Sequence, residues 1–548
     1  MMPEWSPGGA HASPTRLLGE ADAAPAQSPS DAEAPPARFP DDPRRGVVQA
    51  TATRGGGVLS GAMTNSSTAV SPPHAHSGPT RGLSNRHIQL IAIGGAIGTG
   101  LFMGSGRTIS LAGPAVVLVY MAIGFVLFFV MRAMGEILLS NLHYKTFADF
   151  AADLIGPWAG FFVGWSYWFC WIVTAIAELV AITGYVQFWW PSVPLWLPTV
   201  AVLVVVFLLN AVSVKSFGEM EFWFALIKIV AILALIVVGA VMAVTHFTSP
   251  DGNVAQVSNL WNDGGWFPHG AMGVVAGFQI AVFAFVGVEL VGTTAAEARD
   301  PRTTLPRAIN SVPLRILIFY VGSLLAILVV TPWRSINPEQ SPFVAMFSLA
   351  GLGAAASVVN FVVLTSAMSS SNSGVYSTSR MLFGLSAEGS APRLFKGLNR
   401  VGVPVRALFF TALVLLLTIP VLYAGASIIE AFTLITSVAS MLFIFVWSMI
   451  LVSYMCFRRK HPERHAASEY KMPGGLLMCV VVLLFFAFVV WTLTTEVETA
   501  TALVALPVWL VLLGISWAFV RRSESHRQAF EWFKQEVAHP ESAEHADS

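Results

Sequence analysis

Long apolar stretches, separated by short polar segments, recur along the chain from residue 88 to residue 520. A helix needs about 20 apolar residues to cross the hydrocarbon core of a bilayer. The pattern therefore predicts an all-α polytopic membrane protein with twelve transmembrane helices. The twelve segments are residues 88–108, 114–135, 157–189, 195–213, 222–244, 272–296, 314–332, 350–380, 404–424, 428–454, 474–494 and 501–520. The third and eighth exceed the required length, so we expect them to tilt or to extend beyond the bilayer.

The composition also supports a membrane protein, and it distinguishes residues 1–80 from the rest of the chain. Hydrophobic residues make up 55% of the chain and charged residues 11%, against about 25% charged in soluble proteins. The net charge of zero gives no reason to expect nucleic-acid binding. Residues 1–80 are rich in Ala, Pro, Gly and Ser and lack an apolar run, so they are predicted to be a disordered cytoplasmic tail without a signal peptide. Translation from Met63 instead of Met1 is an open alternative.

Lysine and arginine residues orient the predicted helices. From Arg81 onward, placing the N-terminus in the cytoplasm leaves only Arg107 and Arg334 outside and Lys228 within a span. The others fall on or near the cytoplasmic side, as positively charged loop residues do in membrane proteins. The sequence thus predicts a membrane domain at 81–522 and a C-terminal tail at 523–548, with both termini cytoplasmic.

Glycine is unusually frequent in the first apolar segment. Residues 88–112 contain Gly94, Gly95, Gly98, Gly100, Gly104 and Gly106, and Gly113 follows directly. Each glycine disfavours a helix interior by roughly 1 kcal/mol. The density predicts a helix that unwinds at mid-membrane, which is the arrangement that marks the binding site in many transporters. Close helix packing through small residues is the alternative.

The sixth segment is the second candidate for a broken helix. Gly287 lies at mid-segment beside Val286, and Glu289 follows at a depth where an ionisable residue suggests function. Breaks five spans apart are typical of a five-plus-five inverted repeat with broken helices 1 and 6, here followed by two additional helices. For this segment too, helix packing remains an alternative.

Several polar residues lie within apolar segments. Lys228 in segment five either extends its ammonium toward the membrane surface or faces the protein interior, where the cost of burying its charge makes it a candidate proton carrier. Glu178 in segment three is expected to face the interior. Arg132 and Glu136 are four residues apart and predict a structural pair on one helix face.

Residues 366–374 in segment eight are rich in serine, so this face must contact protein or water. A wall of the substrate pathway and interhelical hydrogen bonding are both open. The chain contains no nucleophile elbow, phosphate loop or HExxH motif, and its three cysteines have no zinc spacing. We therefore expect no enzyme activity, no cofactor and no metal.

The chain from Leu83 to about Arg522 resembles bacterial amino-acid permeases of the amino acid–polyamine–organocation superfamily. The resemblance lies in GGAIGTGLF at 94–102, FAFVGVEL at 283–290 and TAAEARDP at 294–301. The stretches at 156–189, LWNDGGWFPHG at 260–270 and SRMLFGL at 379–385 resemble one branch, the proton symporters for D-serine, D-alanine and glycine.

The resemblance implies roles for particular residues. The backbone of the first break binds the substrate carboxylate, and backbone carbonyls before the sixth-segment break, with one from the first segment, hold its ammonium. The Phe283 ring lies over the substrate as a gate. Lys228 replaces a sodium ion between segments one and eight, and Glu289 is a second acid of the coupling machinery. The implied substrate-binding residues are Ala96, Ile97, Gly98, Thr99, Gly100, Phe283 and Val286.

These observations predict a proton-coupled importer of small neutral amino acids, namely D-alanine, D-serine and glycine, in the cell inner membrane. Its partners would be the amino acid, the proton as coupling ion and the lipid bilayer. The alternatives are a permease of the same family for another amino acid, such as an aromatic one or proline, and an amino-acid exchanger without proton coupling. A membrane-embedded enzyme or sensor is a third, of a different class.

Overall fold

The computed structural model describes residues 97–144, 146–212, 214–290 and 300–538. These residues form helices joined by short loops, and their one strand-like pairing is an isolated bridge between Thr248 and Val254. In lipid, every backbone N–H and C=O must be satisfied within the chain, which apolar segments of this length achieve as helices. The prediction of an all-α polytopic membrane protein is confirmed.

Nine helices in the described part of the chain are long and apolar enough to cross a membrane, and Trp196–Ala211 and Gly270–Phe285 are shorter apolar helices. The first predicted segment is not counted as a separate span, because its helix is continuous with that of the second segment. Its helix α3 (Gly104–Ala112) runs through η1 (Gly113–Ala115) into α4 (Val116–Ser140), and its residues before 97 lie outside the described part. The count of twelve stays a prediction.

The described elements follow the predicted segments in order. The spans and their parts are α2 (Thr99–Phe102), α3, α4, α6 (Pro157–Gln187), α7 (Trp196–Val212), α8 (Val214–Val244), α9 (Gly270–Ala281) with η3 (Val282–Phe285), α12 (Val312–Arg315) with η4 (Ile316–Gly322) and α13 (Ser323–Val330), α15 (Gly353–Ala387), α16 (Val405–Leu415) with α17 (Thr418–Ala424), α18 (Ile428–Lys460), α20 (Gly475–Thr492) and α22 (Ala505–Val520). The shorter connecting helices include α5 (Phe147–Leu154), α11 (Pro301–Asn310), α14 (Pro342–Leu349), α19 (Pro462–Ala467), α21 (Val497–Ala500) and α23 (Glu524–Ala538).

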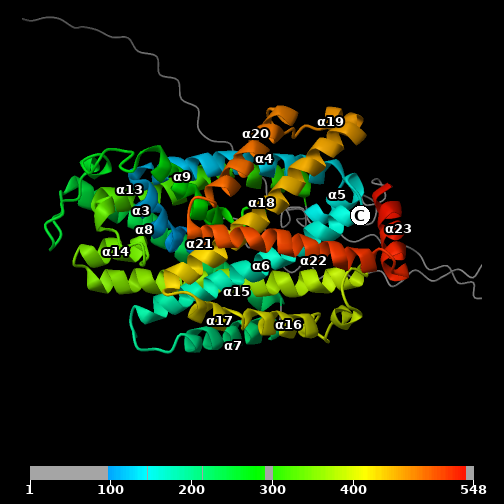
Figure 1. The fold of residues 1–548 in the computed structure, drawn as a ribbon, viewed down its shortest axis with the longest axis horizontal. Helices are drawn as coiled ribbons and strands as arrows, with labels where there is room; N and C mark the ends of the chain where they lie inside the picture. The colour runs from blue at the N-terminus through cyan, green and yellow to red at the C-terminus, as the bar shows by residue number, and fades with distance from the viewer. Residues whose placement is uncertain (1–96, 145, 213, 291–299, 539–548) are drawn as a thin grey trace, which may run out of the picture. The chain divides into compact units, whose positions relative to one another are not determined.

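Helix α6 lies at the centre of the packing and contacts α15, α18 and α5 (Figure 1). With 31 and 35 residues, α6 and α15 are about 46 and 52 Å long at 1.5 Å per residue. Both exceed the roughly 30 Å hydrocarbon core, as predicted. Apolar side chains of outer helices are exposed, among them Leu208, Phe409 and Phe519, which is what contact with lipid tails requires.

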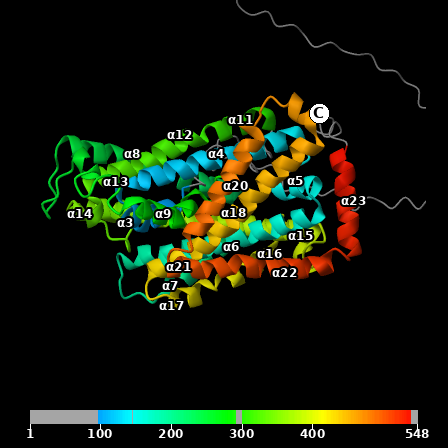
Figure 2. The same ribbon diagram turned by 45° about the horizontal axis from the view of Figure 1, so that its top comes forward.

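The spans share two ends, which we name for use below. The α23 end carries α19 and α23, and the loop end carries α14 and the loop at 245–269 (Figures 1 and 2). Within the segment predicted as a C-terminal tail, α23 packs against other elements. The His526 ring lies 5.4 Å from the Trp517 ring, and the Asn141 amide donates a hydrogen bond of 3.1 Å to the Val537 carbonyl.

The expected pair of Arg132 and Glu136 is replaced by bonds to other segments. Glu136 is fully buried, and its Oε2 accepts a 2.9 Å hydrogen bond from the Tyr454 hydroxyl. Its Oε1 lies 2.5 Å from Nδ1 of His465. Arg132 instead donates to Oδ1 of Asn310 at 3.0 Å. Both side chains therefore fasten α4 to segments far away in sequence at the α23 end.

Candidate functional site

The first apolar segment changes conformation at Gly98. This residue is extended, with φ −126° and ψ −165°, and α2 begins at the next residue, Thr99. The N–H groups of a first helical turn have no acceptor within the helix, so they are available to other acceptors. Ala96 lies outside the described residues.

The sixth segment is broken where predicted. The 3₁₀ turn η3 ends at Phe285, and the next residue, Val286, has a ψ of 135°. Gly287 has a φ of +94°, which favours glycine because it has no Cβ. Glu289 is fully buried and holds this turn. One of its carboxylate oxygens accepts the Gly287 N–H at 3.2 Å, and the other accepts the Tyr167 hydroxyl at 3.2 Å.

The two broken segments meet directly. A Cβ added at Gly100 would lie 2.6 Å from the Cα and 2.7 Å from the N of Ala284 in η3. Glycine is therefore required at 100 for close packing of α2 on η3. At Gly98 the added Cβ would instead meet a side chain, at 3.0 Å from Oε1 of Glu178. The packing alternative thus applies to Gly100, where the neighbours are backbone atoms, whereas a Cβ at Gly98 would meet only the side chains of Glu178 and Ser370.

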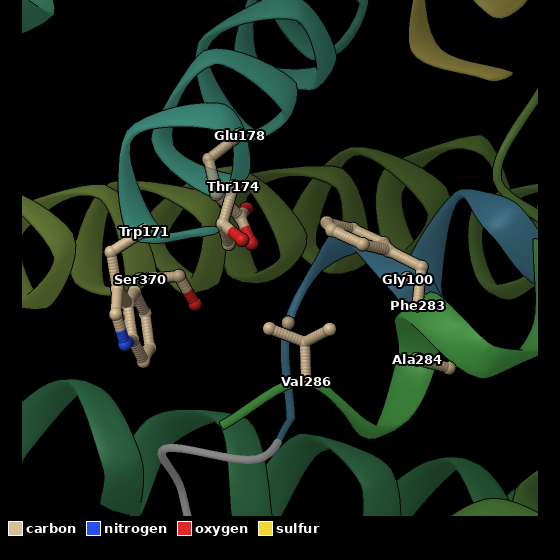
Figure 3. A pocket seen from close by; sticks show the side chains of 9 residues that line it. Gly100, Trp171, Thr174, Glu178, Phe283, Ala284, Val286 and Ser370 are labelled. Atoms are coloured by element: carbon tan, nitrogen blue, oxygen red, sulfur yellow. The ribbon is translucent and has the colours of Figure 1, made fainter. Parts of the chain in front are cut away.

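A small cavity lies at this junction, and several side chains point into it (Figure 3). It is lined by Gly98, Gly100, Trp171, Thr174, Glu178, Phe283, Ala284, Val286 and Ser370. Four of the expected substrate-binding residues, Gly98, Gly100, Phe283 and Val286, are therefore brought together. Ile97 and Thr99 lie next to the cavity in sequence but do not line it.

Three lining residues come from α6 and had no predicted role in the site. Trp171, Thr174 and Glu178 are three, four and seven residues apart, so they share one face of the helix. That spacing was the available signal, although an apolar and aromatic face usually indicates core packing. Oε2 of Glu178 and Oγ1 of Thr99 are buried, and neither has a hydrogen-bond partner among the described residues. Polar atoms in this state are suited to receive a ligand.

Lys228 is buried, with 1% of its surface exposed. Its Nζ donates to the Ile97 carbonyl and to Oγ of Ser369, both at 3.3 Å. The alternative in which its ammonium reaches the membrane surface is therefore wrong. Lys228 joins α8 to the residue before Gly98 and to α15, which are segments one and eight of the prediction.

The serine-rich face of α15 makes interhelical hydrogen bonds and also borders the small cavity. Ser370 lines the cavity, and Ser366 donates to the Ile97 carbonyl at 3.3 Å. Ser369 donates to Oε1 of Glu221 at 2.7 Å. The sequence prediction does not include Glu221, because the predicted apolar segment at 222–244 begins one residue after it.

A larger cavity of about 550 Å³ opens near the loop end. Met103, Gly184, Tyr185, Asn360 and Ile428 are among its lining residues. The edge of the Phe283 ring packs on Phe432, with 5.9 Å between ring centroids, and Phe432 lies one turn after Ile428 in α18. Among the described residues, no cluster of His, Cys, Asp and Glu could hold a metal ion.

Comparison with known proteins agrees with this geometry. The sequence model of the Amino acid permease family matches residues 87–528. The chain belongs to this family. The D-serine/D-alanine/glycine transporter of Escherichia coli K12 is 62% identical over 445 residues, which cover 81% of this chain and 95% of that protein.

Other permeases are more distant relatives. An amino-acid permease of Bacillus subtilis strain 168 is 48% identical over 436 residues, 80% of this chain and 94% of the relative. An aromatic amino acid transport protein of Escherichia coli O6:H1 is 42% identical over 446 residues, 81% of this chain and 96% of the relative. The expectation of an amino-acid permease is confirmed.

Proposed function

We propose that this permease imports small neutral amino acids, namely D-alanine, D-serine and glycine, across the bacterial inner membrane together with a proton. The observation that carries the proposal is the 62% identity with the D-serine/D-alanine/glycine transporter over almost the whole membrane domain. The small cavity at the junction of the two broken segments supports a ligand of few atoms.

The substrate would contact mostly backbone. Its carboxylate would accept N–H groups at the start of α2, near Gly98, Thr99 and Gly100, because a helix N-terminus favours an anion. Its ammonium would bind backbone carbonyls of Phe283 and Val286. The Phe283 carbonyl accepts one hydrogen bond, from the Val286 N–H at 3.2 Å, which leaves a second lone pair.

The first segment would contribute less to binding of the substrate ammonium than the resemblance implies. The Ile97 carbonyl already accepts hydrogen bonds from Lys228 and Ser366, and a carbonyl oxygen has two lone pairs. A substrate ammonium at this oxygen would have to displace one of these donors. Phe283 would close the cavity over the bound substrate, since it lines the cavity and its ring packs on Phe432 of α18.

The coupling proton would be carried by Lys228. Its contact with Ile97 connects its charge state to the residue before Gly98, where the substrate carboxylate is expected. Glu289 would act through the sixth-segment break, because its carboxylate holds the Gly287 turn and does not line the cavity.

The fold of the whole membrane domain would be that of the family. It would have twelve spans with a five-plus-five inverted repeat and two additional helices. The α23 end would face the cytoplasm together with both termini. The breaks at Gly98 and Gly287 and their direct contact support this repeat.

The decisive experiment is uptake of labelled D-alanine into proteoliposomes with an imposed pH gradient, acidic outside. Wild-type protein should concentrate D-alanine, and Lys228→Gln should exchange it without concentrating it. If Lys228→Gln concentrates substrate with normal pH dependence, the proton is carried elsewhere, and Glu178 and Glu289 are the next candidates.

A competition panel then separates the substrate alternatives. Glycine uptake should be inhibited by D-alanine and D-serine and not by phenylalanine, tryptophan or proline. Inhibition by aromatic amino acids alone would indicate transport of aromatic amino acids, the activity for which the more distant relative is named. Exchange that never responds to the pH gradient would identify an exchanger.

A further inference from the structure

A second buried acid lies two helical turns from Lys228 on α8. Glu221 and Lys228 are seven residues apart, so they share one face of the helix with Cα atoms about 10.5 Å apart along its axis. Both side chains are 1% exposed. The gap between them is filled by Ser369 of α15, a helix that packs on α8. Its Oγ lies 3.3 Å from Nζ of Lys228 and 2.7 Å from Oε1 of Glu221.

From this arrangement we infer that Glu221 receives the coupling proton from Lys228 through the hydroxyl of Ser369. The inference rests on the proposed role of Lys228 as the proton carrier. Lys228 donates to Oγ, and the same hydroxyl donates its own hydrogen to Glu221. The three groups thus form a continuous hydrogen-bonded chain with a single direction.

Proton transfer along this chain is balanced. The N–H bond of the Lys228 ammonium breaks as its proton binds Oγ, and the original hydroxyl proton of Ser369 passes to Oε1 of Glu221. The products are a neutral amine, an intact hydroxyl and a neutral carboxyl group. A buried ion pair is converted into two uncharged groups, so the transfer never leaves a single uncompensated charge in the interior.

The position of Glu221 gives the transfer a direction. Helix α6 ends at the loop end, so α7 leads back to the α23 end, where α8 begins. Glu221 therefore lies on the α23 side of Lys228, which is the cytoplasmic side in the proposed orientation. A proton that moves from Lys228 to Glu221 has moved toward the cytoplasm.

The other charged groups around Lys228 fit this assignment. Glu178 of α6 also acts electrostatically on Lys228, but it lines the substrate cavity. Helices α7 and α13, which pack on α8, contain no Asp, Glu, Lys, Arg or His. The charged residue of α15 is Arg380, about three turns beyond Ser369. Tyr320 of η4 donates its hydroxyl to the Ala284 carbonyl. Glu221 is thus the acid that the hydroxyl of Ser369 connects to Lys228.

The test uses the full-length protein in proteoliposomes with glycine as substrate. A gradient of about one pH unit can drive about tenfold accumulation in one-to-one proton symport at zero membrane potential. Glu221→Gln and Ser369→Ala should abolish accumulation above the outside concentration. Both should keep glycine exchange at equal pH within about twofold of wild type, because exchange needs no net proton release. Ser369→Thr keeps the hydroxyl and should restore accumulation.

Two further variants complete the design. Ser371→Ala is the matched control, because Ser371 is a fully buried serine of the same helix with no hydrogen-bond partner for its Oγ among the described residues. It should accumulate glycine like wild type. The double variant Lys228→Gln with Glu221→Gln should transport no worse than Lys228→Gln alone, since groups on one pathway are not additive.

The outcomes separate this inference from the proposed function. If Lys228→Gln loses accumulation while Glu221→Gln and Ser369→Ala keep it, the proton bypasses Glu221 and the inference is overturned, but the symport proposal stands. If exchange is lost together with accumulation and Ser369→Thr does not rescue, the role of the pair is structural and the inference is also overturned. If wild-type protein ignores the pH gradient, the proposed coupling itself is wrong.

Discussion

Gly100 offers the sharpest single test of how the two broken segments are assembled. In Gly100→Ala the new Cβ would lie 2.6 Å from the Cα of Ala284 and 2.9 Å from the carbonyl carbon of Phe283. The first distance is about 1 Å less than the roughly 3.5 Å at which two carbon atoms reach a favourable contact. Both partners are backbone atoms, so rotation of a side chain cannot relieve the clash.

The helix α2 must therefore move away from η3 by about 1 Å or distort. Extra methyl groups in a packed interior typically lower the free energy of unfolding by about 1–3 kcal/mol. We expect a cost at the upper end of that range here, because the clashing atoms belong to the backbone. The movement also displaces the residues expected to bind the substrate carboxylate and ammonium relative to each other. A misplacement of about 1 Å can cost about 100-fold in rate when groups must be positioned accurately.

The assay is initial glycine uptake in proteoliposomes, normalised to the amount of correctly folded protein from size-exclusion chromatography. We expect Gly100→Ala to reduce uptake by about 100-fold and to lower the apparent melting temperature. Gly98→Ala should be milder, because its Cβ would meet the movable side chains of Glu178 and Ser370 at 3.0 and 3.4 Å.

Gly514→Ala is the matched control, because an added Cβ there meets no atom within 4 Å and alanine favours a helix interior over glycine by about 0.5–1 kcal/mol. It should transport normally and be at least as stable as wild type. Normal uptake and stability of Gly100→Ala would refute the close approach of α2 and η3. It would also refute the argument that this packing requires glycine at position 100.

Two further substitutions test the gate and the α23 end. Phe283→Ala removes an aromatic ring that lines the small cavity, so larger amino acids should compete with glycine and glycine affinity should fall; an unchanged competition profile would remove Phe283 from the site. Because truncating a buried phenylalanine costs about 3–5 kcal/mol, Phe283→Leu should accompany it as the milder change. Glu136→Gln weakens the acceptor for Tyr454 and His465 at the α23 end, and lost partners of a buried group cost about 1–3 kcal/mol. The melting temperature should fall while glycine affinity stays unchanged, and an unaltered melting temperature would argue against a stabilising role.

The sequence predicted the two breaks because their signal is local. Glycine is costly inside a helix wherever the helix lies, so its density around Gly98 and its position at 287 were informative without any knowledge of neighbours. The same kind of reasoning singled out Lys228 but left two alternatives for its ammonium, and the packing of the helices decides for the buried one. Polarity in segment eight likewise required partners or a cavity. Ser366 and Ser369 have hydrogen-bond partners, and Ser370 lines the small cavity.

The residues that sequence reasoning missed depend on partners that are distant in the chain. Thr174 and Trp171 resemble core residues until α15 and η3 are placed opposite them. Glu221 lies at the edge of an apolar run, where a carboxylate is usually solvated, and its hydrogen bond from Ser369 of another helix is visible only once the helices are packed. Arg132 and Glu136 illustrate the opposite error, because a favourable local spacing was outweighed by partners on α11 and α18.

The position of α15 suggests why substrate and proton movements would be linked. Ser369 bonds to Glu221 and Lys228, and the next residue, Ser370, lines the substrate cavity. Consecutive residues of a helix point about 100° apart, so one turn of α15 faces both places at once. A shift of this turn that opens the cavity must also change the distances around the Ser369 hydroxyl. Hydrogen bonds weaken steeply with distance and angle, so the proton path and the cavity cannot change independently.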